Sequence, residues 1–205
     1  ELLRAEVAAA GADLGIGFDG DGDRIGIIDG KGRQVPGDLL TAFMAKDVAA
    51  RHPGAPILLD VKSSEAALRL VESAGAAAQI WKTGHSHMKK RMKELEAPLA
   101  GEMSGHIFIA DDYLGFDDAI YAAVRVITQM VKGGQSITEF MDSLPEQHAT
   151  PELRIDCPDT VKFDSMEKIR AHVLSGHDAA DVNSIDGVRV RSGDGWWLIR
   201  ASNTE

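Results

Sequence analysis

The chain has 205 residues, of which 44% are hydrophobic and 26% are charged, a composition typical of a globular protein. Its formal net charge of −10 argues against nucleic acid or an anionic membrane as the main partner. No apolar run approaches the ~20 residues that a membrane-spanning helix needs, and residues 1–15 lack the pattern of a signal peptide. The single cysteine, Cys157, excludes an internal disulfide, so we expect a structural thiol in a cytoplasmic protein.

Hydrophobic periodicity predicts a helix, three successive strands and a second helix up to residue 52, and then strands that alternate with helices from residue 57 to residue 134. Residues 2–10 predict a helix that Gly11 terminates, and Asp38 is a candidate N-cap for a later helix. The expected order is helix 2–10, strand 13–19, strand–turn–strand 24–35, helix 39–52, strand 57–61, helix 64–75, strand 77–84, helix 87–96, strand and loop 98–110, and helix 116–134. This alternation predicts an α/β unit, with a mixed, largely parallel sheet and flanking helices.

The character of the sequence changes after Pro145. Residues 152–157 predict a strand, residues 164–176 a helix, and residues 186–202 two strands across a glycine-rich turn. We therefore expect a smaller α+β module to follow the α/β unit.

The stretch GIGFDGDGDRIGIID, residues 15–29, places three carboxylates at alternate positions, Asp19, Asp21 and Asp23. The glycines between them free the backbone to curl, so that the three side chains can converge. Adjacent carboxylates at ~4 Å repel by roughly 1–4 kcal/mol unless a cation neutralises them. All-oxygen ligands favour Mg²⁺ or Ca²⁺. The stretch therefore predicts a metal site, and a solvated acidic turn is the alternative.

An EF-hand does not fit this loop. Its sixth position requires glycine and holds Arg24, and its twelfth requires glutamate and holds Gly30. Three carboxylates leave coordination positions that water or a phosphate oxygen can fill, which is typical of a catalytic magnesium site.

Other loops follow predicted strands, where ligands of open parallel sheets bind. Lys62 ends an apolar strand, and the alternative is a surface lysine. His85 follows the next strand in the segment KTGH and could move protons near neutral pH; a capping histidine is the alternative, as we expect for His87. In GEMSGH, the side chains of Glu102, Ser104 and His106 offer donors and acceptors that suit sugar hydroxyls, unless the segment is only a polar turn.

The last loop, RASNT, offers a guanidinium and several small donors that could hold a phosphate: Arg200, Ser202, Asn203 and Thr204. By itself this is a weak signal.

The motifs DGDGDR, TGH, GEMSGH and RASNT, in this order and spacing, resemble those of the α-D-phosphohexomutases over nearly the whole chain. The methionine of GEMSGH and the segment LGFDD favour the bacterial phosphomannomutase/phosphoglucomutase branch. This family has four domains around a central cleft. The resemblance implies that residues 1–33 are the end of domain 2 with the metal loop, residues 34–145 are domain 3 with the sugar loop, and residues 146–205 are an incomplete domain 4.

The resemblance also implies a function, the interconversion of hexose 1-phosphate and hexose 6-phosphate through a phosphoserine and a bisphosphorylated sugar. Mg²⁺ would be held by the three aspartates, while Arg24 orients the phosphoryl group and His85, with Lys62, does acid–base work. The implied substrate-binding residues are Thr83, Gly84, Glu102, Ser104, His106, Arg200, Ser202, Asn203 and Thr204.

The serine of the family's TASHNP-like loop has no counterpart in the chain, and the phosphate loop lacks its usual continuation. We therefore expect the chain to be inactive alone and to need the missing domains of its parent. One alternative is a non-catalytic module that binds metal and sugar phosphate. A metal-dependent phosphatase is disfavoured, because Asp21-Gly22-Asp23 leads into Arg24 and not into the threonine of a D-x-D-G-T motif.

Overall fold

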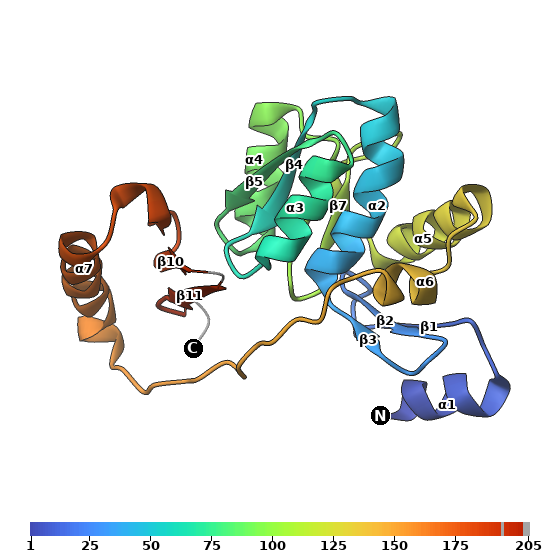
Figure 1. Ribbon diagram of the computed structural model, residues 1–205, viewed down its shortest axis with the longest axis horizontal. Coiled ribbons are helices and arrows are strands. Elements are labelled where there is room, and N and C mark those ends of the chain that lie inside the picture. Colours follow the sequence, from blue (N-terminus) through green and yellow to red (C-terminus); the bar gives the residue numbers. More distant parts are fainter. Residues whose placement is uncertain (194, 203–205) are drawn as a thin grey trace. The chain divides into compact units, whose positions relative to one another are not determined.

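A computed structural model describes residues 1–193 and 195–202 of the chain (Figure 1). The chain divides into two compact units, residues 1–145 and a second unit that begins at Glu146. Among the described residues, no helix combines the length and the apolar character needed to cross a membrane.

The first unit opens with a helix and a small antiparallel sheet, α1 (Leu2–Ala10), β1 (Leu14–Phe18), β2 (Ile25–Asp29) and β3 (Gln34–Val35). Helix α1 ends where Gly11 adopts φ 58°, a left-handed conformation that glycine takes without a steric penalty. The strand order is β1-β2-β3, and the register pairs Phe18 with Ile25. The β1–β2 hairpin therefore presents residues 19–24 at its tip.

A five-stranded sheet forms the centre of the first unit, with β4 (Pro56–Asp60), β5 (Ala77–Trp81), β6 (Leu99–Gly101), β7 (Ile107–Ile109) and β8 (Phe116–Asp117). Its order is β5-β4-β6-β7-β8. Strand β4 pairs in parallel with β5 and β6, whereas β6–β7 and β7–β8 are antiparallel, so the mixed sheet is confirmed. The carboxyl ends of the three parallel strands share one edge of the sheet.

Helices cover both faces of this sheet, as Figure 1 shows. Because successive side chains of a strand point to opposite faces, Ile57 and Leu59 join the larger core while Leu58 joins the other. The larger core packs under α2 (Gly37–Arg51), α3 (Glu65–Ser73), α5 (Ala119–Gly133) and α6 (Ile137–Asp142). On the opposite face, α4 (His85–Leu95) contributes Met88 and Met92.

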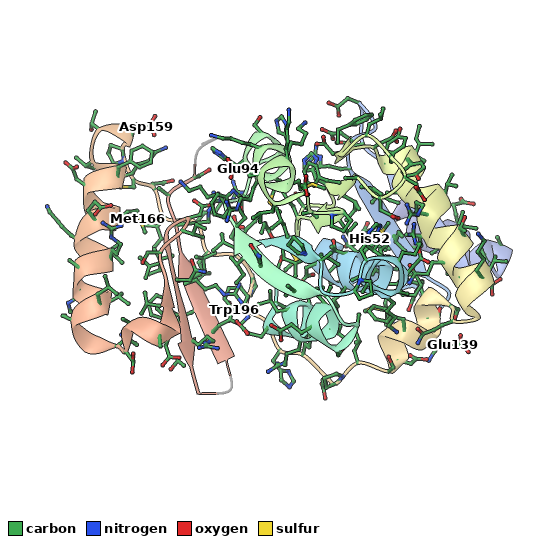
Figure 2. The ribbon with its side chains drawn as sticks, turned by 90° about the horizontal axis from the view of Figure 1, so that it is seen from above. His52, Glu94, Glu139, Asp159, Met166 and Trp196 are labelled. Atoms are coloured by element: carbon green, nitrogen blue, oxygen red, sulfur yellow. The ribbon has the colours of Figure 1, made fainter. Side chains whose placement is uncertain are left out.

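The second unit consists of α7 (Asp159–Gly176), a 3₁₀ turn η1 (Ala179–Asp181) and the strands β9 (Val182–Asn183), β10 (Val188–Ser192) and β11 (Gly195–Ile199). The strands form an antiparallel sheet in the order β11-β10-β9. Met166, labelled in Figure 2, packs from α7 against a small core of Val173, Val188 and Val190.

Three expectations from the sequence require correction, and one helix was not predicted. Asp38 is not the N-cap of α2, because Pro36 takes that position and the Asp38 side chain is buried in the first turn. Residues 152–157 form no strand; Leu153 and Ile155 are 82% and 87% exposed, and the segment joins none of the sheets of the described residues. The short helix α6 was not expected. Cys157 is exposed, so it is not a packed structural thiol.

Candidate active site

The tip of the β1–β2 hairpin brings three aspartates together as the sequence predicts. Ligand oxygens of Asp19, Asp21 and Asp23 all lie within 4.8 Å of one another. Asp21 is exposed, whereas Asp19 and Asp23 are half-buried. Three converging carboxylates fit a hard divalent cation such as Mg²⁺, which prefers oxygen ligands and retains several waters.

Arg24 holds one of these carboxylates in place. Its Nε donates to Asp19 Oδ2 at 2.6 Å, and the backbone N–H groups of Arg24 and Gly22 donate to Asp19 Oδ1 at 3.1 and 3.2 Å. Burial works to raise the pKa of Asp19, but the hydrogen bonds from Arg24 prevail and lower it to about 2. Asp19 is therefore ionised at neutral pH, in the state that a metal ligand requires.

The segment 102–106 lies directly beside this loop. Arg24 and His106 form an antiparallel β-bridge, and Ile25 N–H donates to the carbonyl oxygen of Gly105 at 3.1 Å. The His106 Nδ1 atom lies 3.7 Å from Asp23 Oδ2. Backbone pairing thus places the predicted sugar loop against the predicted metal loop, although about 80 residues separate them in sequence.

His106 connects the metal loop to a second carboxylate. Its Nδ1 lies 3.0 Å from Asp117 Oδ2, and Lys89 Nζ donates to Asp117 Oδ1 at 2.9 Å. Burial works to raise the pKa of Asp117, but the hydrogen bond and charge of Lys89 and the nearby His106 lower it. Asp23, His106 and Asp117 also place one ligand atom each within 4.8 Å, so Asp23 is common to two groups of potential ligands.

Gly105 permits the close approach of the two loops. It adopts φ +96°, and a Cβ built on it would lie 2.5 Å from the backbone oxygen of Ile25. We expect Gly105→Ala to lower the free energy of unfolding of the first unit by about 3 kcal/mol or more, from backbone strain and overpacking together.

The matched control for this substitution is Gly134→Ala. Gly134 has φ +65°, and a Cβ built on it would meet no described atom within 4 Å, so only the strain of about 1–2 kcal/mol remains. Urea unfolding, followed through amide resonances of the first unit, checks the pair. Equal losses for the two variants would contradict a close loop contact at Gly105.

The segment 83–85 joins the site through the buried side chain of Glu102. Gly84 N–H donates to Glu102 Oε1 at 2.8 Å, and Ser104 Oγ donates to Glu102 Oε2 at 3.1 Å. Burial raises the pKa of Glu102, a direction that the Gly84 and Ser104 hydrogen bonds oppose. Helix α4 begins at His85, whose exposed ring stacks near the His106 ring with centroids 6.1 Å apart.

Lys62 lies at the carboxyl end of β4, and its charge acts on the neighbouring Asp60. Asp60 is fully buried and accepts hydrogen bonds from Ser63, Thr83 and Met103. Asp60 is not among the site residues predicted from the sequence. Its position as an acidic residue at the end of the apolar run ILLD is the one feature of the sequence that could have indicated it. Thr83 and Met103 are thus connected through Asp60, and Lys62 acts on the same carboxylate through its charge.

The predicted phosphate-binding residues belong to the second unit. Arg200 Nη2 lies 3.2 Å from Asp186 Oδ2, and its buried Nε has no hydrogen-bond partner within the part of the chain that the structure describes. The backbone oxygen of Ser202 accepts from Lys162 Nζ at 2.8 Å. Asn203 and Thr204 lie outside the described residues.

Comparison with known proteins relates the chain to one family. Residues 36–148 match the family described as "Phosphoglucomutase/phosphomannomutase, alpha/beta/alpha domain III", and residues 152–205 match its "C-terminal domain". The phosphomannomutase/phosphoglucomutase of Pseudomonas putida is 45% identical over 204 residues, which cover 100% of this chain and 44% of the relative. The chain therefore spans less than half the length of this relative.

Solved structures share the fold. The crystal structure of a phosphoglucomutase/phosphomannomutase family protein from Burkholderia thailandensis has a TM-score of 0.87 and 37% identity, covering 100% of this chain and 43% of its own. The Aspergillus fumigatus N-acetylphosphoglucosamine mutase, solved in complex with GlcNAc-6P and magnesium, has a TM-score of 0.52 and 16% identity over 63% of this chain and 34% of its own. These matches, together with the arrangement of the loops, show that the chain belongs to the phosphoglucomutase/phosphomannomutase family.

Proposed function

We propose that this chain is part of an enzyme that interconverts hexose 1-phosphate and hexose 6-phosphate through a phosphoserine and a bisphosphorylated sugar. The observation that carries this proposal is the convergence of the segments 19–24, 83–85 and 102–106 in the first unit. The names of the matched relatives support the same activity. Mannose and glucose phosphates are both substrates that such a site can accept, and the cytoplasm is the compartment that one unpaired cysteine suits.

The proposed domain scheme assigns residues 1–33 to the end of domain 2, residues 34–145 to domain 3 and residues 146–205 to an incomplete domain 4. Two features of the first 145 residues support the proposal that further domains of the whole enzyme pack against them. Strand β1 is an edge strand of its sheet, with an unpaired side among the described residues. Helix α5 exposes an apolar stripe at helical spacing, made of Ile120, Val124, Ile127 and Val131. We propose that the missing domains also supply the serine nucleophile.

Asp19, Asp21 and Asp23 would hold Mg²⁺ in this scheme. Their convergence and the low pKa of Asp19 support the assignment, as does the magnesium in the Aspergillus neighbour. The bound ion would neutralise charge on the phosphoryl oxygens.

A single substitution tests the metal assignment with little structural cost. Asp21 is the exposed member of the trio. We expect Asp21→Asn to weaken Mg²⁺ binding by about tenfold or more, because Mg²⁺ affinity depends on the number of charged oxygen ligands. Calorimetric titration of the chain measures this.

Asp13→Asn is the matched control, because Asp13 is exposed at the opposite end of β1 and the variant removes the same charge. We expect the wild-type chain itself to bind Mg²⁺ weakly, since the phosphoserine would supply a further ligand. Equal affinities for the two variants would remove the aspartate trio from the metal site.

The protein groups around the trio would do the rest of the chemistry. Arg24 would orient the phosphoryl group, and Lys62 would offset its negative charge. When the sugar hydroxyl attacks phosphorus, the bond from phosphorus to the serine oxygen breaks, His85 takes the hydroxyl proton, and the released serine oxygen takes up a proton from water. In the reverse transfer at the other end of the sugar, the serine hydroxyl loses its proton to water and attacks phosphorus. The bond from phosphorus to the sugar oxygen then breaks, and His85 returns its proton to that oxygen.

The remaining residues would bind and align the substrate. Each oxygen of Glu102 accepts one hydrogen bond and has capacity for another from a sugar hydroxyl. The same two segments, 83–85 and 102–106, contain the other residues proposed to bind the sugar: Thr83, Gly84, Ser104 and His106. The phosphate that is not transferred would be held by Arg200, Ser202, Asn203 and Thr204, so that remote binding energy aligns the reacting end.

An activity assay tests the proposed function. The whole enzyme should convert glucose 1-phosphate to glucose 6-phosphate in the presence of Mg²⁺, and the 205-residue chain should show no turnover. Both proteins are purified from a host that lacks contaminating mutase. Turnover by the chain alone would contradict the assignment of the nucleophile to the missing domains. Absence of turnover in the whole enzyme would contradict the mutase function and favour a binding module.

A further inference from the structure

One buried carboxylate, that of Asp60, accepts hydrogen bonds from three of the segments around the candidate site. Asp60 is the last residue of β4 and is 0% exposed. Burial of an ionisable group without partners is costly, so its partners indicate why the fold retains it. Ser63 and Glu102 are also buried, and both interact with Asp60.

The hydrogen bonds to Asp60 come from three different segments. Ser63 Oγ donates to Oδ1 at 2.7 Å, Met103 N–H donates to the same oxygen at 3.3 Å, and Thr83 Oγ1 donates to Oδ2 at 3.2 Å. Each donor is close in sequence to a residue assigned to the reaction, respectively Lys62, Ser104 and His85.

Glu102 holds the same segment from a second direction. Asp60 binds the side chain of Thr83, while Glu102 accepts from the backbone N–H of Gly84 at 2.8 Å. Consecutive residues before His85 are therefore fixed by two different buried carboxylates. Burial raises the pKa of both groups, and the Asp60 charge contributes to raising the pKa of Glu102. The free-energy cost of burying these two carboxylates is offset by hydrogen bonds only when all three segments are in place.

We propose that Asp60 is a positioning residue, which sets the relative placement of Lys62, His85 and the 102–106 segment without touching substrate. Its effect on the reaction rests on the proposed function. Its effect on the placement of the loops does not depend on the proposed function, so the two effects can be measured separately.

The first measurement is amide hydrogen exchange in this chain for Asp60→Ala and Asp60→Asn. We expect Asp60→Ala to speed exchange at Met103 and Gly84 by about 10- to 100-fold relative to β4, the equivalent of leaving one buried donor without its acceptor. Gly84 does not bond to Asp60, so its response reports transmission through Thr83 or through Glu102 and Met103. Asp60→Asn should restore most of the protection, because its amide oxygen still accepts from Met103 and its amide group donates to Thr83 Oγ1.

The matched control is Asp111→Asn, a buried carboxylate of the same unit with ion-pair partners of its own. It should speed exchange across the whole unit without singling out Met103 and Gly84. A uniform change in Asp60→Ala, or a change at Met103 with none at Gly84, would overturn the proposal.

Should Asp60→Ala fail to fold, Thr83→Val removes one of the three donors and leaves the carboxylate in place. It should speed exchange at Gly84 by about tenfold. Unchanged exchange at Gly84 would overturn the proposal in this variant as well.

The second measurement is kinetic, in the whole enzyme. Asp60→Ala should lower kcat about 100-fold, the cost of small misplacement of reacting groups, with a smaller change in KM. Asp60→Asn should recover most of kcat. Loss that appears in KM alone would overturn the positioning role. If the wild-type whole enzyme shows no mutase activity, the proposed function fails, whereas the exchange results decide the placement of the loops by themselves.

Discussion

Replacement of His85 by asparagine is expected to lower kcat of the whole enzyme by about 10²- to 10⁴-fold, the usual contribution of a general acid–base. The ring is exposed at the first residue of α4 and its centroid lies 6.1 Å from that of His106, which approaches Asp23. In the proposed reaction, an exposed ring at this position would be open to a sugar hydroxyl. Steady-state kinetics with glucose 1-phosphate measures the loss.

His87→Asn is the matched control for this prediction. His87 lies in the same first turn of α4 and is also exposed, yet it belongs to none of the described contacts that join the loops. We expect its kcat to stay near that of the wild type, and both variants should unfold at similar denaturant concentrations. A loss of kcat that is the same for both histidines would show a general effect of the helix start and would remove His85 from proton transfer.

Asp111→Asn should have a large effect on stability. Asp111 is 4% exposed; its Oδ2 lies 2.7 Å from Arg125 Nη2 and also contacts Arg51, and its Oδ1 lies 2.8 Å from the Nε2 atom of His52, labelled in Figure 2. We expect a loss of about 3 kcal/mol in the free energy of unfolding, at the low end for a broken buried pair because Arg51 is partly exposed. Urea unfolding at neutral pH measures it.

This loss should depend on pH in a defined direction. Burial works to raise the pKa of Asp111, but His52, Arg125 and Arg51 lower it below its ordinary value of ~3.9. A lowered pKa in the folded state contributes stability that is fully present above the unfolded value and is lost as pH falls through the folded value. The difference between wild type and Asp111→Asn should therefore be constant near neutrality and should shrink below about pH 4.

The neighbouring Asp112 provides the control. Its side chain is 88% exposed and pairs with Arg51 at 3.4 Å, and its φ of 55° is one that asparagine also tolerates. Asp112→Asn should change the free energy of unfolding by no more than about 0.5 kcal/mol. Equal losses at the two positions, or a difference at Asp111 that grows on acidification, would contradict the buried ion-pair account.

Much of the fold could be predicted because its signals are local. The apolar run of residues 57–61 indicates a strand covered on both faces, and Leu58 indeed faces α4 while Ile57 faces the larger core. Residues 152–157 show the limit of such reasoning. Their alternation is that of a half-buried strand, but a strand also needs a partner, and Leu153 and Ile155 are exposed.

Some residues of the candidate site could likewise be predicted from local sequence, and others could not. The aspartate trio could be predicted because Asp19, Asp21 and Asp23 share one short loop, and the structure brings their oxygens within 4.8 Å. Asp60 could not be predicted, because its role depends on donors from residues 63, 83 and 103 that only the tertiary structure assembles. Asp38 was misassigned for a similar reason: its carboxylate accepts from the backbone N–H of Ser64, 26 residues away.

The most direct test of the central claim is a titration of the chain with Mn²⁺, a paramagnetic substitute for Mg²⁺, followed by NMR. A divalent ion held by the aspartate trio should broaden the amide resonances of residues 19–24 first, together with the ring resonances of His106 and His85. Asp21→Asn should weaken this broadening at every one of these positions. Sharp resonances in these segments, with broadening at acidic side chains elsewhere on the surface, would contradict a metal-centred site formed by these loops.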